Sequence, residues 1–206
     1  DIETSGLPNA AEFLEPVEAA KNLVDPIKIA ADVAKREAAR LEQVGLDWNL
    51  GRIVALGWQY TGGTVTADVY PDEQEETRLL RVFWEDYLEW NRPRLIGFYC
   101  RRFDLPYLIQ RSRYLGVKHP EIPLKRYGST DFTDLYDLLT FDDAPAASVM
   151  SRSLTMFCRR FGIPTPDGAI TGADIAGCVA RGEWEQVRQH CEQDVALTAA
   201  LAKRLG

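Results

Sequence analysis

The order of apolar and polar residues predicts helices and strands along most of the chain. Apolar positions at helical spacing predict helices at 73–90, 105–115, 153–161, 175–180 and 184–205. Apolar runs bounded by turn residues predict strands at 52–60, 64–70 and 94–99, the first two joined by a turn at Gly62-Gly63. A further short element falls at 131–139. This order is typical of an α/β protein with a mixed sheet flanked by helices.

Residues 5–50 interrupt this pattern. Early glycine and proline residues break regular structure, and Asp25-Pro26 then provides a helix start with proline in the first turn. Apolar residues recur at helical spacing over 27–41. We expect this helix to pack on the core, with the shielding of a substrate groove as the alternative. Because no repeat or second domain is visible, we predict a single domain at 1–206 with a helical insertion at about 5–50.

Composition sets looser limits. With 206 residues, 46% of them hydrophobic, the chain can bury one sizeable core. No apolar run has the length of a membrane span, and no secretory leader is visible, so we predict no membrane partner. The four cysteines form no C-x-x-C pair and give no zinc-like spacing with the two histidines. We interpret them as free thiols, which predicts a cytoplasmic protein.

The charge is unevenly distributed. The net charge of −7 argues at first against a nucleic-acid partner, but residues 92–126 contain nine basic side chains and two acidic ones. A basic band of this kind suits a phosphate backbone. A solvated helix face that keeps the protein in solution is the alternative, and charge alone does not decide between them.

The residues that point most clearly to chemistry are four carboxylates far apart in sequence, namely Asp1, Glu3, Asp104 and Asp194. Each belongs to a local pattern that suggests that the fold gathers them. At about 5 Å such charges repel by roughly 3 kcal/mol per pair at an effective dielectric near 20. They would therefore be partly protonated or would capture divalent cations, and oxygen ligands suit Mg²⁺ and Mn²⁺. Two such ions can promote phosphodiester hydrolysis, so the pattern predicts a metal-dependent nuclease.

The start of the chain raises a separate question. A carboxylate pair such as Asp1 and Glu3 normally ends a buried strand, yet the sequence shows no residue before Asp1 and no initiator Met. We therefore expect the natural chain to begin upstream of Asp1.

Several motifs carry a resemblance to a known family. In chain order they are Asp1-Ile2-Glu3-Thr4, the run Gly-Phe-Tyr-Cys-Arg-Arg-Phe-Asp-Leu-Pro-Tyr-Leu at 97–108, 134–139, Ser153-Leu154, 161–164, Gly172 and 190–195. The chain resembles the DEDD 3′–5′ exonucleases of the ribonuclease H-like superfamily. It is most similar to the stand-alone exonucleases related to the proofreading domain of family-B DNA polymerases. The resemblance covers about 51–206 plus the first tetrapeptide, and the ordered set is far more specific than any single motif.

The resemblance implies a fold and a mechanism. The implied fold is a five-stranded mixed sheet, with three antiparallel and two parallel strands, flanked by helices. Asp1, Glu3 and Asp194 would hold the metal that activates the attacking water, and Asp1 with Asp104 would hold the metal nearer the leaving 3′ oxygen. The implied activity is two-metal hydrolysis at the 3′ ends of single-stranded DNA, with Mg²⁺ or Mn²⁺ as cofactor and nucleoside monophosphates as products.

We expect a further group of residues to contact the substrate: Thr4, Tyr99, Arg101, Arg102, Phe103 and Arg111. Tyr99 departs from the family, whose members usually carry Asn at this place. Its ring could stack on a terminal base or fill the buried face of a strand. Arg101 and Arg102 could contact phosphates or be only solvated.

His190 lies four residues before Asp194 and therefore on the same helix face. One subgroup of the family has Tyr at that place, whereas an imidazole can take a proton near pH 7. We predict that His190 is a general base or positions the attacking water, and a partly exposed histidine that caps nothing is the alternative. Asp134 and Asp137 could support the site or cap a short helix.

Three functions remain open. They are a DNA exonuclease, for which replication and repair proteins are candidate partners, an exoribonuclease with the same chemistry, and a non-catalytic nucleic-acid-binding module. The presence of all the carboxylates argues against the last.

Overall fold

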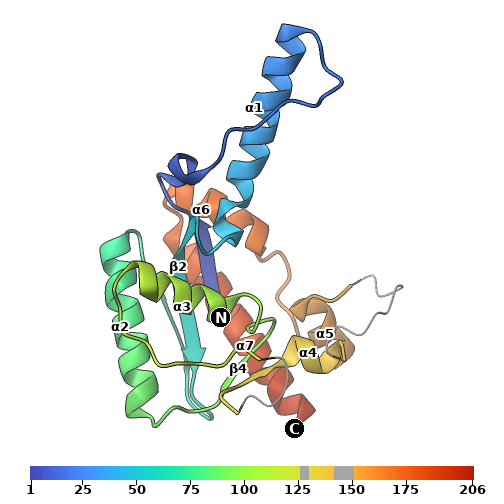
Figure 1. Ribbon diagram of the computed structural model, residues 1–206. Coiled ribbons are helices and arrows are strands. Elements are labelled where there is room, and N and C mark those ends of the chain that lie inside the picture. The colour runs from blue at the N-terminus through green and yellow to red at the C-terminus, as the bar shows by residue number, and fades with distance from the viewer. Residues whose placement is uncertain (126–129, 142–150) are drawn as a thin grey trace.

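The computed structural model describes residues 1–125, 130–141 and 151–206 (Figure 1). Strands β1 (Ile2–Gly6), β2 (Gly51–Gln59) and β3 (Val65–Val69) form an antiparallel sheet in the order β1-β2-β3. Strands β4 (Leu95–Gly97) and β5 (Phe132–Asp134) form a parallel pair. The predicted mixed α/β class is confirmed, with three antiparallel and two parallel strands. Within the described residues, however, the two sheets are not joined by a ladder into the single five-stranded sheet that we expected.

Helices cover both faces of the antiparallel sheet. On one face lie α2 (Glu73–Glu89) and α3 (Asp104–Tyr114), and on the other α6 (Ile175–Arg181) and α7 (Trp184–Leu205). Helices α4 (Leu135–Leu139) and α5 (Leu154–Arg160) pack instead in a separate cluster with the C-terminal part of α7. Ile53 and Leu56 of β2 share a core cluster with α2 and α3. Val54 and Ala55 share another with α6 and α7 on the opposite face. The sheet is therefore enclosed between the pair α2–α3 and the pair α6–α7.

Local sequence explains where several of these helices begin and end. The side chain of Asp72 accepts hydrogen bonds from two backbone N–H groups in the first turn of α2, which begins at the predicted residue. Helix α7 has the predicted bounds, and its apolar residues face β2 and β3. The strand predicted at 94–99 covers only Leu95–Gly97 and is therefore shorter than expected. It is also less buried than expected, since Ile96 is 53% exposed.

The segment between β1 and β2 forms an arm that projects from the rest of the protein (Figure 1). It contains two short 3₁₀ helices, Ala10–Phe13 and Val44–Leu46, and helix α1 (Pro26–Gln43), capped by the side chain of Asp25 as predicted. No residue of α1 is buried, so the expectation that this helix packs on the core is wrong. Its least exposed residues are Ile29, Asp32 and Val33, and all its alanines are exposed.

Near β2 the arm contacts α3, where the hydroxyl of Tyr107 donates to the carbonyl of Gly45, and its outer part is held by its own hydrogen bonds. Asp32 accepts a hydrogen bond from the backbone of Ala20, and Arg40 donates to the carbonyl of Glu15. These bonds hold α1 against the segment that leads into it. Among the described residues, no helix combines the length and the apolar character that a membrane span requires.

Candidate active site

The four predicted carboxylates come from three elements and meet at one end of β1. Ligand atoms of Asp1, Glu3 and Cys191 lie within 4.8 Å of one another. Asp104 begins α3, and its Oδ1 lies 3.9 Å from the amine nitrogen of Asp1. Asp104 and Asp194 are outside the 4.8 Å set, but the charges of both raise the pKa of Glu3. The fold thus brings all four into one electrostatic cluster.

Strand alternation and helix periodicity explain this placement. In β1 the side chain of Ile2 enters the core with α2 and α3, so its neighbour Glu3 points to the other face, toward α7. On α7, His190 and Asp194 are separated by four residues and share one face. Helix α7 therefore presents both side chains to the acidic end of β1.

His190 is bonded directly to Glu3. Its Nδ1 lies 2.7 Å from Oε1 of Glu3, and the two side chains are 10% and 8% exposed. The hydrogen bond to Glu3 raises the pKa of His190, although burial opposes this. The alternative of a partly exposed histidine that caps nothing therefore does not fit the structure.

Burial is the main cause of the other pKa shifts in the cluster. It raises the pKa of Glu3, Asp104 and Asp194, and the proximity of like charges raises that of Glu3 further. Such a group of crowded, desolvated carboxylates is stabilised by a divalent cation, and oxygen donors are the ligands that Mg²⁺ and Mn²⁺ prefer. The residues present therefore fit a divalent cation.

Cys191 is the member of the 4.8 Å set that the sequence did not point to as a site residue. Burial raises the pKa of its thiol, and its Sγ lies 3.7 Å from the backbone oxygen of Asp1. A protonated thiol is a poor ligand for a hard cation. We therefore assign Cys191 to packing between α7 and β1; all four cysteines are buried and free, as predicted.

The loop before α3 is held by two aspartates. Asp134 accepts hydrogen bonds from the backbone N–H groups of Tyr99 and Arg101, at 2.8 and 2.9 Å, and also caps α4. Asp137 accepts from Arg101 at 2.6 Å and from Arg102. Burial would raise the pKa of Asp137, but these hydrogen bonds lower it. The two arginines are therefore partly neutralised rather than simply solvated.

Tyr99 adopts a left-handed backbone with φ of 62°, a conformation that Asn tolerates better than an aromatic residue. Its side chain is 40% exposed, so it does not fill a buried strand face. Its ring packs edge-on against Tyr136 at 4.9 Å, and the guanidinium of Arg102 lies 5.5 Å from both ring centroids. This exposed aromatic group lies on the loop that leads into Asp104. Tyr136 was not predicted as part of it.

Thr4 and Phe103 lie near the candidate site, but Arg111 does not face solvent. Thr4 bonds to the hydroxyl of Tyr107, and the Phe103 ring packs 5.4 Å from the same tyrosine. Arg111 is 2% exposed and binds Glu76 and Glu73, so its predicted contact with substrate does not fit the structure. Arg126 of the basic band lies outside the described residues. Because Arg111 is buried in ion pairs, it does not add to the surface charge of the band.

Comparison with known proteins identifies a family for the chain. Residues 49–204 match a family of predicted 3′–5′ exonucleases related to the exonuclease domain of PolB, whose fold is ribonuclease H-like. The match covers most of the chain, and the chain belongs to this family. It is therefore an enzyme of the 3′–5′ exonuclease class. Among curated proteins, none matches the chain. The matched residues include Asp104, His190 and Asp194, whereas Asp1 and Glu3 precede them.

Proposed function

We propose that this chain is a metal-dependent exonuclease that hydrolyses the terminal phosphodiester at the 3′ end of single-stranded DNA and releases nucleoside monophosphates. The observation that carries the proposal is the convergence of Asp1, Asp104 and Asp194 around Glu3, with the pKa of Glu3, Asp104 and Asp194 raised by burial. An acidic cluster of this kind, with His190 as its one neighbouring cationic side chain among the residues described above, is costly for a fold to maintain unless it binds cations.

The carboxylates would hold two Mg²⁺ or Mn²⁺ ions. Asp1, Glu3 and Asp194 would bind one of them, and Asp1 with Asp104 the other. When bound, such ions supply an activated water and neutralise the charge that develops on the leaving oxygen. The protein's own contribution is to position these side chains at the start of β1, on α3 and on α7, with Glu3 and Asp104 buried.

His190 would accept the proton of the attacking water. Its Nδ1 is engaged with Glu3, which orients the ring and leaves Nε2 as the acceptor in the neutral form. Glu3 thus has two roles, because it belongs to the metal-binding cluster and also fixes the orientation of the imidazole.

The substrate would approach over the loop before α3. The exposed ring of Tyr99 offers a stacking surface for a terminal base. Phe103 directly precedes Asp104 in the same loop, and Thr4 directly follows Glu3 on β1. Arg101 and Arg102 would contact phosphates after partial release from Asp137. The buried free thiols favour a reducing compartment such as the cytoplasm, and replication or repair proteins are candidate partners.

The experiment that tests this function compares labelled single-stranded DNA and RNA oligonucleotides, each with Mg²⁺, Mn²⁺ or EDTA. We expect stepwise shortening of DNA from its 3′ end, dependent on the metal and absent in Asp104→Ala. Faster shortening of RNA would instead identify an exoribonuclease. Binding without any metal-dependent shortening would contradict catalysis and favour a binding module.

A matched control is available close to the site. Asp137→Ala removes a buried carboxylate of similar size that pairs with Arg101 and Arg102. We expect this variant to change KM but to keep metal-dependent cleavage. Loss of cleavage in Asp104→Ala but not in Asp137→Ala would separate metal-binding acids from acids that organise the loop.

A further inference from the structure

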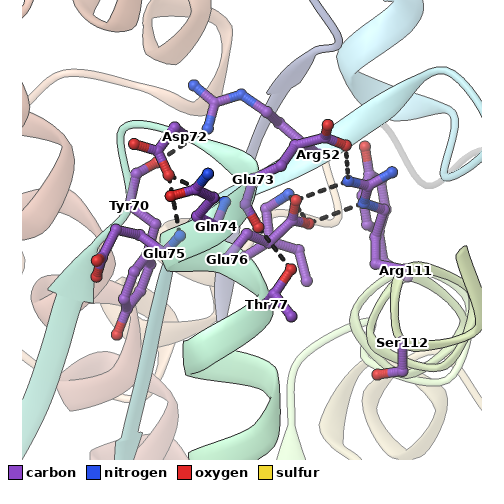
Figure 2. A network of polar contacts seen from close by, with 12 residues as sticks. Arg52, Tyr70, Asp72, Glu73, Gln74, Glu75, Glu76, Thr77, Arg111 and Ser112 are labelled. Carbon is purple, nitrogen blue, oxygen red and sulfur yellow. Dashed lines mark hydrogen bonds and ion pairs between the residues drawn. The ribbon is translucent and has the colours of Figure 1, made fainter. Parts of the chain in front are cut away.

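A buried ion pair lies between α2 and α3 (Figure 2). Glu76 is 0% exposed and Arg111 is 2% exposed. Nε and a terminal nitrogen of Arg111 donate to the two carboxylate oxygens of Glu76, at 2.8 and 2.7 Å, and Glu73 accepts a further bond at 2.9 Å. Two parallel bonds fix the orientation of the groups as well as their distance. The pair is therefore a directional link between the two helices.

Glu76 also reaches the central strand. The backbone N–H of Ile53 donates to Oε1 of Glu76 at 2.9 Å. At this point the register between β1 and β2 shifts, because Glu3 faces Ala55 whereas Thr4 faces Ile53. Val54, between them, faces no residue of β1.

This irregularity has the character of a β-bulge. Val54 and Ala55 are consecutive, yet both pack in the cluster with α6 and α7. Bulges next to active sites change the direction in which neighbouring side chains point. The shift lies beside Glu3, the residue around which the acidic cluster is built.

Arg111, the other member of the ion pair, lies on the same helix as Asp104. Arg111 is seven residues after Asp104 in α3, which corresponds to about two turns and therefore to the same face of the helix. A helix transmits a displacement of one turn to the next. A bond that holds Arg111 in place therefore also restrains the first residue of α3.

We propose that Glu76 and Arg111 are positioning residues, which fix Glu3 and Asp104 relative to each other by tying the bulge of β2 to α3. Arg111 then acts through these two carboxylates, rather than through a phosphate of the substrate. The catalytic consequence rests on the proposed metal-dependent function, whereas the structural consequence does not.

The test uses a variant that removes both charges. Glu76→Met/Arg111→Met replaces the pair with apolar side chains of similar length, so that no unpaired charge remains buried. The matched control is Ser112→Ala. Ser112 is also buried and accepts a 2.8 Å bond from Trp84 of α2, but no bond to β2 is found for it. Figure 2 shows Ser112 apart from the Glu76–Arg111 contacts.

Three experiments are done on each protein. Calorimetry gives the Mn²⁺ dissociation constant, steady-state kinetics on a DNA oligonucleotide give kcat and KM, and amide hydrogen exchange is followed in residues 2–6. For the double variant we expect Mn²⁺ affinity and kcat to fall by about 10-fold or more, with KM little changed and exchange in β1 faster. In Ser112→Ala all of these quantities stay close to the wild-type values.

Several outcomes would overturn the proposal. One is a folded double variant with wild-type Mn²⁺ affinity and wild-type exchange in β1; another is a higher KM with unchanged Mn²⁺ affinity, which would return Arg111 to substrate contact. If the double variant does not fold, Arg111→Lys is measured in the same way, because it keeps the charge without the two parallel hydrogen bonds. The same criteria then apply: lower Mn²⁺ affinity and faster exchange in β1 support the proposal, and wild-type values overturn it. If the wild type neither binds Mn²⁺ nor cleaves DNA, the proposed function fails. Exchange in β1 then decides alone, since faster exchange supports the positioning role and unchanged exchange overturns it.

Discussion

Glu3 and Glu76 are buried glutamates on opposite sides of the antiparallel sheet, and they differ in what surrounds them. Glu3 is bonded to His190 and shares its surroundings with Asp104 and Asp194, whose charges add to the effect of burial on its pKa. Glu76 is bonded to the guanidinium of Arg111, whose charge compensates its own. A compensated carboxylate has little tendency to bind a cation, whereas a carboxylate among other carboxylates has a strong one. The signs of the neighbouring charges therefore distinguish a candidate functional acid from a structural acid, and burial alone does not.

The largest expected effect is on catalysis. Glu3→Gln keeps the shape of the side chain but removes the charge that holds a cation, whose contribution to the transition state is several kcal/mol. We expect kcat to fall by at least about 10³-fold while the melting temperature stays the same or rises. A steady-state cleavage assay with thermal denaturation measures both. Near-normal turnover in Glu3→Gln would remove the contrast between the two glutamates.

For the structural pair we expect a large loss of stability, which Glu3→Gln does not show. Arg111→Met leaves Glu76 buried without a cationic partner, which should lower the free energy of unfolding by about 3–5 kcal/mol. Urea denaturation of the metal-free protein measures this loss. Arg78→Met is the control, because it removes an exposed ion pair of the same helix with Glu75 and should change stability by less than about 1 kcal/mol. Equal effects in the two variants would contradict the structural assignment.

His190 connects the acidic cluster to proton transfer. We expect His190→Ala to lower kcat by about 10²-fold or more, since general-base catalysis contributes on that scale. Mn²⁺ affinity, measured by calorimetry, should remain close to that of the wild type. Turnover near the wild-type value would show that His190 has no catalytic role.

The raised pKa values predict how stability depends on pH. A raised pKa means that the folded, metal-free protein binds protons more tightly than the unfolded chain. For Glu3, Asp104 and Asp194 the resulting stabilisation is present in acid and is lost as the pH rises through their raised pKa values. For His190 it is present below the ordinary pKa of 6.5 and is lost above the raised one.

The metal-free protein should therefore melt at a lower temperature at pH 8 than at pH 6. Mn²⁺ at about 100 times its dissociation constant should raise the melting temperature at pH 8 by about 5–10 °C, and by less at pH 6, where protons compete for the same oxygens. Scanning calorimetry at the two pH values measures this difference. An equal rise at both would mean that the metal does not displace protons from this cluster.

The smallest expected effect concerns the strained backbone beside the cluster. Tyr99 has a φ of 62°, and Asn tolerates this conformation better than an aromatic residue. We expect Tyr99→Asn to raise the free energy of unfolding by about 1 kcal/mol and to increase KM if the ring stacks on a base. Denaturation and steady-state kinetics measure the two effects. Unchanged stability would show that the contacts with Tyr136 offset the strain.

Much of this structure could be predicted from the sequence. Helices α2 and α7 are amphipathic over many residues, and Asp25 and Asp72 are strong capping signals, so these boundaries were predicted closely. The cluster of Asp1, Glu3, Asp104 and Asp194 was predicted from the order of motifs. Strand alternation and helix phase show only which side chains share a face of one element, and they do not show which elements lie together.

Other features leave little local signal. Glu76 belongs to the run Glu-Gln-Glu-Glu at 73–76, and helical phase places it on the buried face with Leu79 and Leu80. No sequence pattern, however, indicates the cation that pairs with it there. Its partner Arg111 lies among other arginines, where a phosphate contact was the natural interpretation. The separation of the two sheets also depends on tertiary packing, because strands of three residues such as β4 provide few pairing groups.

The long connection between β1 and β2 has a consequence for the order of folding. These two strands pair directly, yet residues 7–50 separate them, whereas β2 and β3 are joined by a short turn. Closing the longer loop costs more entropy, so the β2–β3 hairpin should form before β1 joins it. Asp1 and Glu3 would then reach their positions late, and the protein would become active as a nuclease only once β1 has paired with β2. Pulse-labelled hydrogen exchange during refolding should show protection in β2 before β1.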